Sequence, residues 1–318
     1  MPGSGGPRAD PAPFGDRLHA RVAERQSQLV LGLDPDPARL WPRAIELAGG
    51  PGDPPAAPAA RAAMAVAIHC KLAIEAAGEH CVATKLQVAC FERLGASGWA
   101  ALAEVVKRAR DHGLLVIADA KRGDIDVSAA AYAQAFLTET PTPFGPIPGL
   151  DADALTVNPL LGADSLAPFI EAARSAGAGL FVLTRTSNPG AADIQELALS
   201  TGDIVSERIA GLVDQLGAGG MGESGLSDIG AVVGATAPER LERLRELMPH
   251  AVFLLPGVGA QGGQVADLAA AFAPGIAGGL VSASRGIVAA HEKLGGDPAA
   301  AAAEEAKRLR EIAWSLAG

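Results

Sequence analysis

The sequence predicts an α/β protein whose eight parallel strands close into a (β/α)8, or TIM, barrel. Eight short apolar runs alternate with helical patterns along the 318 residues, and each run ends in polar residues. Strands that are apolar throughout belong to parallel sheets covered by helices. Eight such units favour a closed barrel, with an open doubly wound sheet as the alternative. The expected strands are residues 28–34, 82–87, 114–119, 152–158, 179–184, 228–234, 251–255 and 278–282.

Helices are expected between these strands, where apolar residues recur at helical spacing. A short amphipathic helix at residues 13–26 precedes the first strand, and we find no domain boundary after it. Residues 13–318 are therefore expected to form one barrel domain behind a flexible tail at residues 1–12, which is rich in Pro, Gly and Ala. The other clear helical patterns are residues 97–112, 124–137, 164–176 and 238–248. Surface loops are expected at the Pro/Gly-rich residues 49–60, 138–149 and 217–225.

Composition narrows the class of protein. Hydrophobic residues make up 49 % and charged residues 19 %, which is typical of a globular protein with a large core. A net charge of −10 argues against a nucleic-acid partner and leaves a small anionic ligand open. Neither a signal peptide nor a membrane span is expected. Cys70, Cys81 and Cys90 lack the spacing of a zinc site, so we expect reduced thiols in a cytoplasmic protein.

The segment LLVIADAKRGDID at residues 114–126 is the most informative part of the chain. Asp119 and Lys121 lie two residues apart, so on an extended backbone they point to the same face. Asp124 falls where the next helix is expected to begin, and Lys85 lies in the neighbouring strand. Such an alternating array can keep a lysine protonated beside an anionic substrate. The simpler interpretation is a structural ion pair, with Asp124 capping its helix.

Polar residues also follow the other expected strands, at the end where barrel proteins carry their chemistry. Gly257, Gly259 and Gly262 have the spacing G-x-G-x-x-G, which could indicate a dinucleotide site in which Arg285 reads a 2′-phosphate. Six strand–helix units precede this motif, whereas a dinucleotide fingerprint opens the first. A phosphate site after strands seven and eight of a barrel is the favoured interpretation. The remaining strand-end residues are Asp34, Gln87, Asn158, Ser187, Thr236 and Gln261.

Together these motifs resemble the orotidine 5′-phosphate decarboxylase family. DAKRGDI, at residues 119–125, is similar to the family signature Asp-x-Lys-x-x-Asp-Ile. LGLDP, TKLQVACFE, TVNPLLGADSLAPF and TSNPGA are similar to other segments of the family. The resemblance runs from Phe14 to the last helix and is to the longer, second type found in many bacteria.

The resemblance implies decarboxylation of orotidine 5′-monophosphate to UMP, the last step of UMP biosynthesis, without cofactor or metal. Lys121 would protonate C6 of the pyrimidine, Asp119 would lie beside the substrate carboxylate, and Lys85 would hold the ribose and position Asp119. Asp124 would reach the partner subunit's site in a homodimer. Implied substrate contacts are Asp34 and Ser128 at the ribose, Ser187 and Pro256 at the pyrimidine, Gln261, Ser284 and Arg285 at the phosphate, and Asn158 in the pocket wall. Ser128 stands where the family usually has Thr, and its hydroxyl preserves the contact.

Loss of CO2 from C6 leaves a carbanion without a conventional electron sink. No thiamine, pyridoxal or flavin motif is visible in the sequence, so we expect catalysis by electrostatics and positioning. Residues 138–149 and 191–202 are candidate mobile loops.

Three other functions remain open. Mg²⁺-dependent enzymes of the same scaffold, hexulose-phosphate synthase and keto-gulonate-phosphate decarboxylase, need a further acidic residue near the second strand, where this chain has Lys85 and Gln87 before Glu92. A Schiff-base aldolase would need a lysine of depressed pKa, which flanking aspartates oppose. A protein that binds a nucleotide or phosphate without turnover would need only the pocket.

Overall fold

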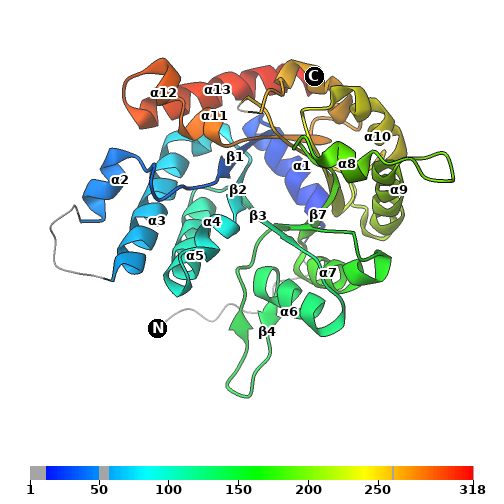
Figure 1. The fold of residues 1–318 in the computed structure, drawn as a ribbon, viewed down its shortest axis with the longest axis horizontal. Coiled ribbons are helices and arrows are strands. Elements are labelled where there is room, and N and C mark those ends of the chain that lie inside the picture. The colour runs from blue at the N-terminus through cyan, green and yellow to red at the C-terminus, as the bar shows by residue number, and fades with distance from the viewer. Residues whose placement is uncertain (1–11, 50–56, 260, 318) are drawn as a thin grey trace.

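A closed barrel of eight parallel strands forms the centre of the protein, and helices surround it (Figure 1). The computed structural model describes residues 12–49, 57–259 and 261–317, so residues 1–11 of the expected tail lie outside the described residues. Each strand pairs with its neighbour in parallel, and the last strand closes on the first. This closure confirms the predicted barrel against the doubly wound sheet. In barrel order the strands are β1 (Leu29–Leu33), β2 (Ala83–Gln87), β3 (Leu115–Arg122), β6 (Ala154–Val157), β7 (Gly179–Arg185), β8 (Ile229–Val233), β9 (Phe253–Pro256) and β10 (Gly279–Ala283).

Helices occupy the regions where periodicity predicts them. The larger ones are α1 (Phe14–Arg25), α3 (Pro58–Ala77), α5 (Ala96–Asp111), α6 (Asp126–Phe136), α7 (Ala163–Ala176), α9 (Val205–Gly217), α10 (Leu241–Leu247) and α13 (Pro298–Ala317). The short ones are α2 (Pro42–Leu47), α4 (Ala89–Glu92), α8 (Ala191–Gln195), α11 (Arg285–Val288) and α12 (His291–Leu294). The 3₁₀ turns within the described residues are η1 (Gly78–His80), η2 (Ala218–Gly220), η3 (Pro238–Arg240) and η4 (Val265–Phe272). No described helix has both the length and the apolar character to cross a membrane.

The expected loops differ in detail from the structure. Residues 138–149 contain a small antiparallel hairpin of β4 (Glu139–Thr140) and β5 (Ile147–Pro148). Helix α3 begins inside the expected loop 49–60, because its first residue is Pro58 and proline suits the first turn of a helix. The loop at residues 217–225 docks on α1, where the Asp16 carboxylate accepts the backbone N–H groups of Glu223 and Ser224 at 3.1 and 2.8 Å.

Helix α1 covers the N-terminal end of the barrel. The ring of Phe14 meets the ring of Phe181 edge-on, with centroids 5.9 Å apart. A Cβ atom on Gly179 would lie 2.4 Å from the Phe14 ring, so the close approach of α1 requires glycine there. With this end closed by apolar side chains, the opposite end, where the strands terminate, is left for a ligand.

Arg245 is a buried cation that joins the last third of the barrel. Its guanidinium lies over the Phe253 ring, 3.7 Å from the centroid, and burial lowers the pKa of Arg245 to about 9. Instead of a carboxylate it binds backbone carbonyls at 2.7 to 3.0 Å, those of Met248, Ala251, Ala271 and Gly278. One side chain therefore connects α10, η4 and the segments leading into β9 and β10.

We expect Arg245→Met to lower the free energy of unfolding by about 3 kcal/mol, because buried carbonyls lose their donor. Urea unfolding monitored by circular dichroism measures the change. Arg243→Met, two residues earlier on the exposed side of α10, is the matched control and should leave the midpoint unchanged. Equal midpoints for both variants would show that the carbonyl contacts contribute nothing.

Candidate active site

A cavity of about 390 Å³ lies at the C-terminal ends of the barrel strands. Eleven of the residues singled out from the sequence line it: Asp34, Lys85, Gln87, Asp119, Lys121, Ser187, Pro256, Gly257, Gln261, Ser284 and Arg285. It is also lined by Thr156, Thr186 and Asn188, which lie in segments quoted for the family resemblance but to which the sequence analysis assigned no role. The strand ends thus gather the predicted polar side chains around one space.

The Asp119 carboxylate is the centre of the polar network in this cavity. Its Oδ2 atom accepts hydrogen bonds from Lys85 Nζ at 2.6 Å and Gln87 Nε2 at 3.1 Å. Its Oδ1 atom accepts from Lys121 Nζ at 2.5 Å and Thr156 Oγ1 at 3.0 Å. Two donors on each oxygen are close to the full capacity of a carboxylate. The group is therefore fixed in orientation and held from β2, β3 and β6 at once.

Burial and opposite charge act against each other in the Lys85–Asp119 pair, whose residues are only 6 % and 5 % exposed. Burial alone would raise the pKa of Asp119, but the ammonium groups of Lys85 and Lys121 hold that pKa well below its usual range. Burial alone would lower the pKa of Lys85, but Asp119 and Asp34, whose Oδ1 atom lies 3.9 Å from Lys85 Nζ, raise it. Both groups are charged at neutral pH, which opposes a Schiff-base role for Lys85.

The backbone around Lys121 departs from the extended strand assumed in the sequence analysis. Ala118 pairs with Leu155, but the next pairing on β6 joins Arg122 to Val157. Lys121 itself has a φ of +51°, in the left-handed region. The expectation of an extended backbone at Lys121 is therefore wrong. Lys121 reaches Asp119 because an irregularity of this kind redirects the side chain.

Asp124, Ser128 and Asn158 lie outside the cavity lining. The Asp124 Oδ1 atom accepts the N–H of Ile125 at 2.9 Å. Helix α6 begins at Asp126, two residues after Asp124, where the sequence analysis expected the helix to begin. Ser128 is exposed on α6, and Asn158 Oδ1 accepts the N–H of Leu160 at 3.0 Å. A single chain therefore does not bring these three residues to the other polar groups, and their roles stay predictions.

Away from Asp119, the cavity is lined by a positively charged residue, Arg285, and by a turn that contains Gly257. Gly257 has a φ of +102°, and a Cβ atom there would lie 2.9 Å from Gln261 Oε1 and 3.0 Å from Ser187 Cβ. Glycine is thus required where the loops after β7 and β9 approach each other. Arg285, the first residue of α11, is exposed at the cavity, and its guanidinium has no hydrogen-bond or ion-pair partner within the described residues. In a chain of net charge −10, such an arginine suits an anionic ligand.

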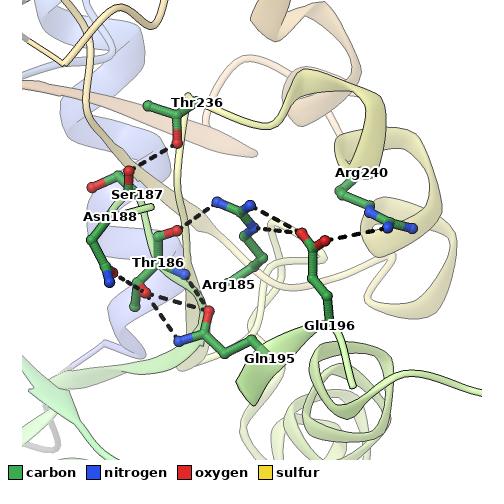
Figure 2. Close-up of polar contacts among 8 residues, drawn as sticks. All are labelled: Arg185, Thr186, Ser187, Asn188, Gln195, Glu196, Thr236 and Arg240. Atoms are coloured by element: carbon green, nitrogen blue, oxygen red, sulfur yellow. Dashed lines mark hydrogen bonds and ion pairs between the residues drawn. The ribbon is translucent and has the colours of Figure 1, made fainter. Parts of the chain in front are cut away.

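The loop after β7, which carries Ser187, is held by side chains from outside the cavity (Figure 2). The N–H of Thr186 donates to Gln195 Oε1 at 2.8 Å, which joins the loop to α8. On the other side, Thr236 Oγ1 donates to the carbonyl of Ser187 at 3.1 Å. Thr236, one of the strand-end residues of the sequence analysis, therefore supports the loop instead of lining the cavity.

Ion pairs continue this network away from the cavity. Arg185, the last residue of β7, pairs with Glu196 at 3.0 Å, and Glu196 lies 3.6 Å from Arg240 on η3 (Figure 2). Arg185 also donates to the carbonyl of Thr186 at 2.8 Å. Residues 191–202, expected as a mobile loop, thus begin with the helical turn α8 and are joined to β7 and η3 by these contacts. Gln195 and Glu196 carry no motif that would reveal this role in the sequence.

The fold and site together define a (β/α)8-barrel protein in which a Lys–Asp–Lys array, centred on a buried carboxylate, and an exposed arginine line one cavity. The sequence profile of the orotidine 5′-phosphate decarboxylase / HUMPS family matches residues 27–304, and the chain belongs to this family. It is 40 % identical to the orotidine 5′-phosphate decarboxylase of Deinococcus radiodurans, over 94 % of this chain and 96 % of the relative. The decarboxylase of Rhodopirellula baltica is also 40 % identical, over 88 % and 89 %. Among solved structures, Leishmania donovani OMP decarboxylase aligns with a TM-score of 0.69 and 32 % identity, over 95 % of this chain and 99 % of that one.

We expect Lys85→Met to lower the free energy of unfolding by about 3 kcal/mol, because it leaves the buried Asp119 carboxylate without its main counter-charge. Lys121→Ala should cost less than about 1 kcal/mol in stability, since that ion pair is partly solvated: the Lys121 side chain is 44 % exposed. Chemical denaturation of both variants beside the wild type measures the difference. Equal losses would contradict the assignment of Lys85 as the structural partner of Asp119.

Proposed function

We propose that this protein is an orotidine 5′-phosphate decarboxylase, which converts orotidine 5′-monophosphate to UMP and CO2. The observation that carries the proposal is the Asp119 carboxylate held between Lys85 and Lys121 in the cavity that also contains Arg285. Membership of the family and the names of the relatives support it. We assign the chain to the longer, second type of the family, as its motifs suggest.

In this mechanism the C6–carboxylate bond breaks, CO2 leaves and the electron pair remains on C6. The Lys121 ammonium offsets the growing negative charge and then transfers a proton to C6. Asp119 lies beside the substrate carboxylate and, because its own pKa is far below neutral, stays ionised and holds the Lys121 ammonium group through a hydrogen bond. A fixed charge in a cavity of low dielectric needs no reorganisation during the reaction, and this lowers the barrier.

The reaction proposed here needs no metal and no cofactor. In residues 12–49, 57–259 and 261–317, no group of three His, Cys, Asp or Glu side chains is arranged to hold a metal ion. The Mg²⁺-dependent reactions of the same scaffold need a further acidic residue near the second strand, where this chain has Lys85 and Gln87 bound to Asp119, and this supports the decarboxylase. Free cysteines, with Cys70 and Cys81 buried, support a cytoplasmic location.

The substrate lies across the cavity in this proposal, with its phosphate at the Arg285 end. Binding energy from a group that does not react can order the site around the group that does. Asp34 contacts the ribose, Ser187 and Pro256 contact the pyrimidine, and Gln261, Ser284 and Arg285 bind the phosphate. All six residues line the cavity, which supports this division.

We also propose a homodimer in which Asp124 and Ser128 serve the partner's site. Both residues lie outside the cavity of their own chain. Large apolar side chains near them are open to solvent, with Val127 83 % and Leu160 79 % exposed and Ile125 and Leu161 at least half exposed. An apolar surface of this kind is typical of a protein–protein contact. A second copy that covers it would bring Asp124 toward the other Lys121.

We expect the purified protein to decarboxylate orotidine 5′-monophosphate equally well with and without EDTA. Lys121→Ala should reduce the rate at least about 1000-fold, because the general acid is lost, and should remain folded. The absorbance change of the pyrimidine measures turnover, and circular dichroism measures folding. No turnover by folded wild-type protein would reject the proposal. Inhibition by EDTA that Mg²⁺ reverses would indicate one of the metal-dependent reactions instead.

Arg285→Ala should weaken binding of UMP by about 10- to 100-fold, because a charge-assisted contact to phosphate is lost. Binding of uridine, which lacks the phosphate, should not change. Isothermal titration calorimetry with both ligands on wild type and variant separates the two effects. A parallel loss of uridine binding would place Arg285 elsewhere than at the phosphate.

A further inference from the structure

A buried hydroxyl on β6 connects the two charged residues of β3. Thr156 is 1 % exposed and lines the cavity. Its Oγ1 atom accepts the backbone N–H of Lys121 at 2.9 Å and donates to the Asp119 Oδ1 atom at 3.0 Å. A hydroxyl can do both at once, since it has one donor hydrogen and two acceptor lone pairs. A methyl group of the same shape can do neither.

This hydroxyl lies at the interruption of the barrel between β3 and β6. Ala118 pairs with Leu155 and Arg122 with Val157, so residues 119–121 all lie opposite Thr156. Beyond the interruption, the N–H of Asn158 donates to the Arg122 carbonyl at 2.8 Å. The Thr156 side chain is therefore the contact between the strands at the point where Lys121 adopts its left-handed backbone.

The residue after Lys121 is anchored separately. The Arg122 guanidinium pairs with Glu92, and it lies over the rings of Tyr132 and Phe136 at 5.2 and 5.4 Å from their centroids. Arg122 thus fixes the far side of the irregular segment to α4 and α6. On the near side, the Lys121 backbone is held by the Thr156 hydroxyl. A left-handed backbone at a residue with a Cβ atom is unfavourable unless its surroundings hold it.

We propose that Thr156 is a positioning residue for the decarboxylation, an inference that rests on the proposed function. Its two hydrogen bonds fix the Lys121 backbone and the Asp119 carboxylate relative to each other, so that the ammonium group keeps one place over the reacting carbon. Without the hydroxyl, Asp119 loses one of its four donors and the Lys121 N–H loses its acceptor. The segment can then relax toward an ordinary backbone and move the ammonium group away.

Thr156→Val tests this directly, because it keeps the shape and removes the hydroxyl. We expect kcat to fall about 10- to 100-fold, as when a proton donor is misplaced. Affinity for UMP, which lacks the C6 carboxylate, should stay within about twofold of wild type, and Thr156→Ser should restore most of kcat. Thr184→Val is the matched control: Thr184 is buried in β7, its hydroxyl donates to the Val182 carbonyl, and it is not part of the cavity lining.

Three results would overturn the inference: an unchanged kcat in Thr156→Val, an equal loss in Thr156→Ser, or an equal loss in Thr184→Val. A parallel fall of kcat and UMP affinity would reduce Thr156 to a structural role and also overturn it. If Thr156→Val does not fold, Thr156→Ser and Thr156→Ala give the same contrast, since they differ only by the hydroxyl.

Amide hydrogen exchange at Lys121 gives a readout that does not depend on turnover. The amide should be protected in wild type and Thr156→Ser and should exchange faster in Thr156→Ala or Thr156→Val. Equal protection in all of them would overturn the inference. If the wild type shows no turnover, the proposed function fails, and the exchange data still decide whether Thr156 fixes the Lys121 backbone.

Discussion

The rest of the site depends on the hydrogen bonds and ion pairs that the Asp119 carboxylate makes. Four donors from three strands converge on its two oxygens, so its position fixes Lys85, Lys121, Gln87 and Thr156 relative to one another. A buried charge without partners is strongly unfavourable, and this requirement keeps the array together. The same carboxylate is the group proposed to face the substrate, so structural demand and chemical role coincide in one residue.

The two ends of the barrel differ in polarity, and the two lysines of this array differ in their exposure to solvent. At one end α1 packs apolar rings into the barrel, and at the other the strands terminate in polar residues around the cavity. Lys85 lies deep in β2, whereas the Lys121 side chain is partly open at the rim. The two lysines therefore differ in what they can do. Lys85 stabilises the Asp119 carboxylate from inside the barrel, and Lys121 is accessible to a ligand.

The strands were predictable from the sequence because each is a short apolar run between helical patterns, and adjacency in the barrel was enough to bring Lys85 to Asp119. The left-handed backbone of Lys121 could not be predicted, since nothing in the sequence Asp-Ala-Lys-Arg indicates such a conformation. Thr156 was assigned no role because threonine is common in strands, where it usually only packs against its neighbours. Gln195 and Glu196 were missed because their partners on β7 and η3 lie close only in the folded chain. The roles of Asp124 and Ser128 stay predictions, because neither residue lines the cavity of its own chain.

The support of the loop after β7 has a consequence for protein engineering. Gln195, Glu196, Thr236 and Arg240 hold this loop without lining the cavity (Figure 2). A mutant library confined to cavity positions would change the side chains that the loop presents but not the scaffold behind it. Selection for a larger or differently shaped base would therefore have to include these four outer positions, where a single substitution can move the whole loop.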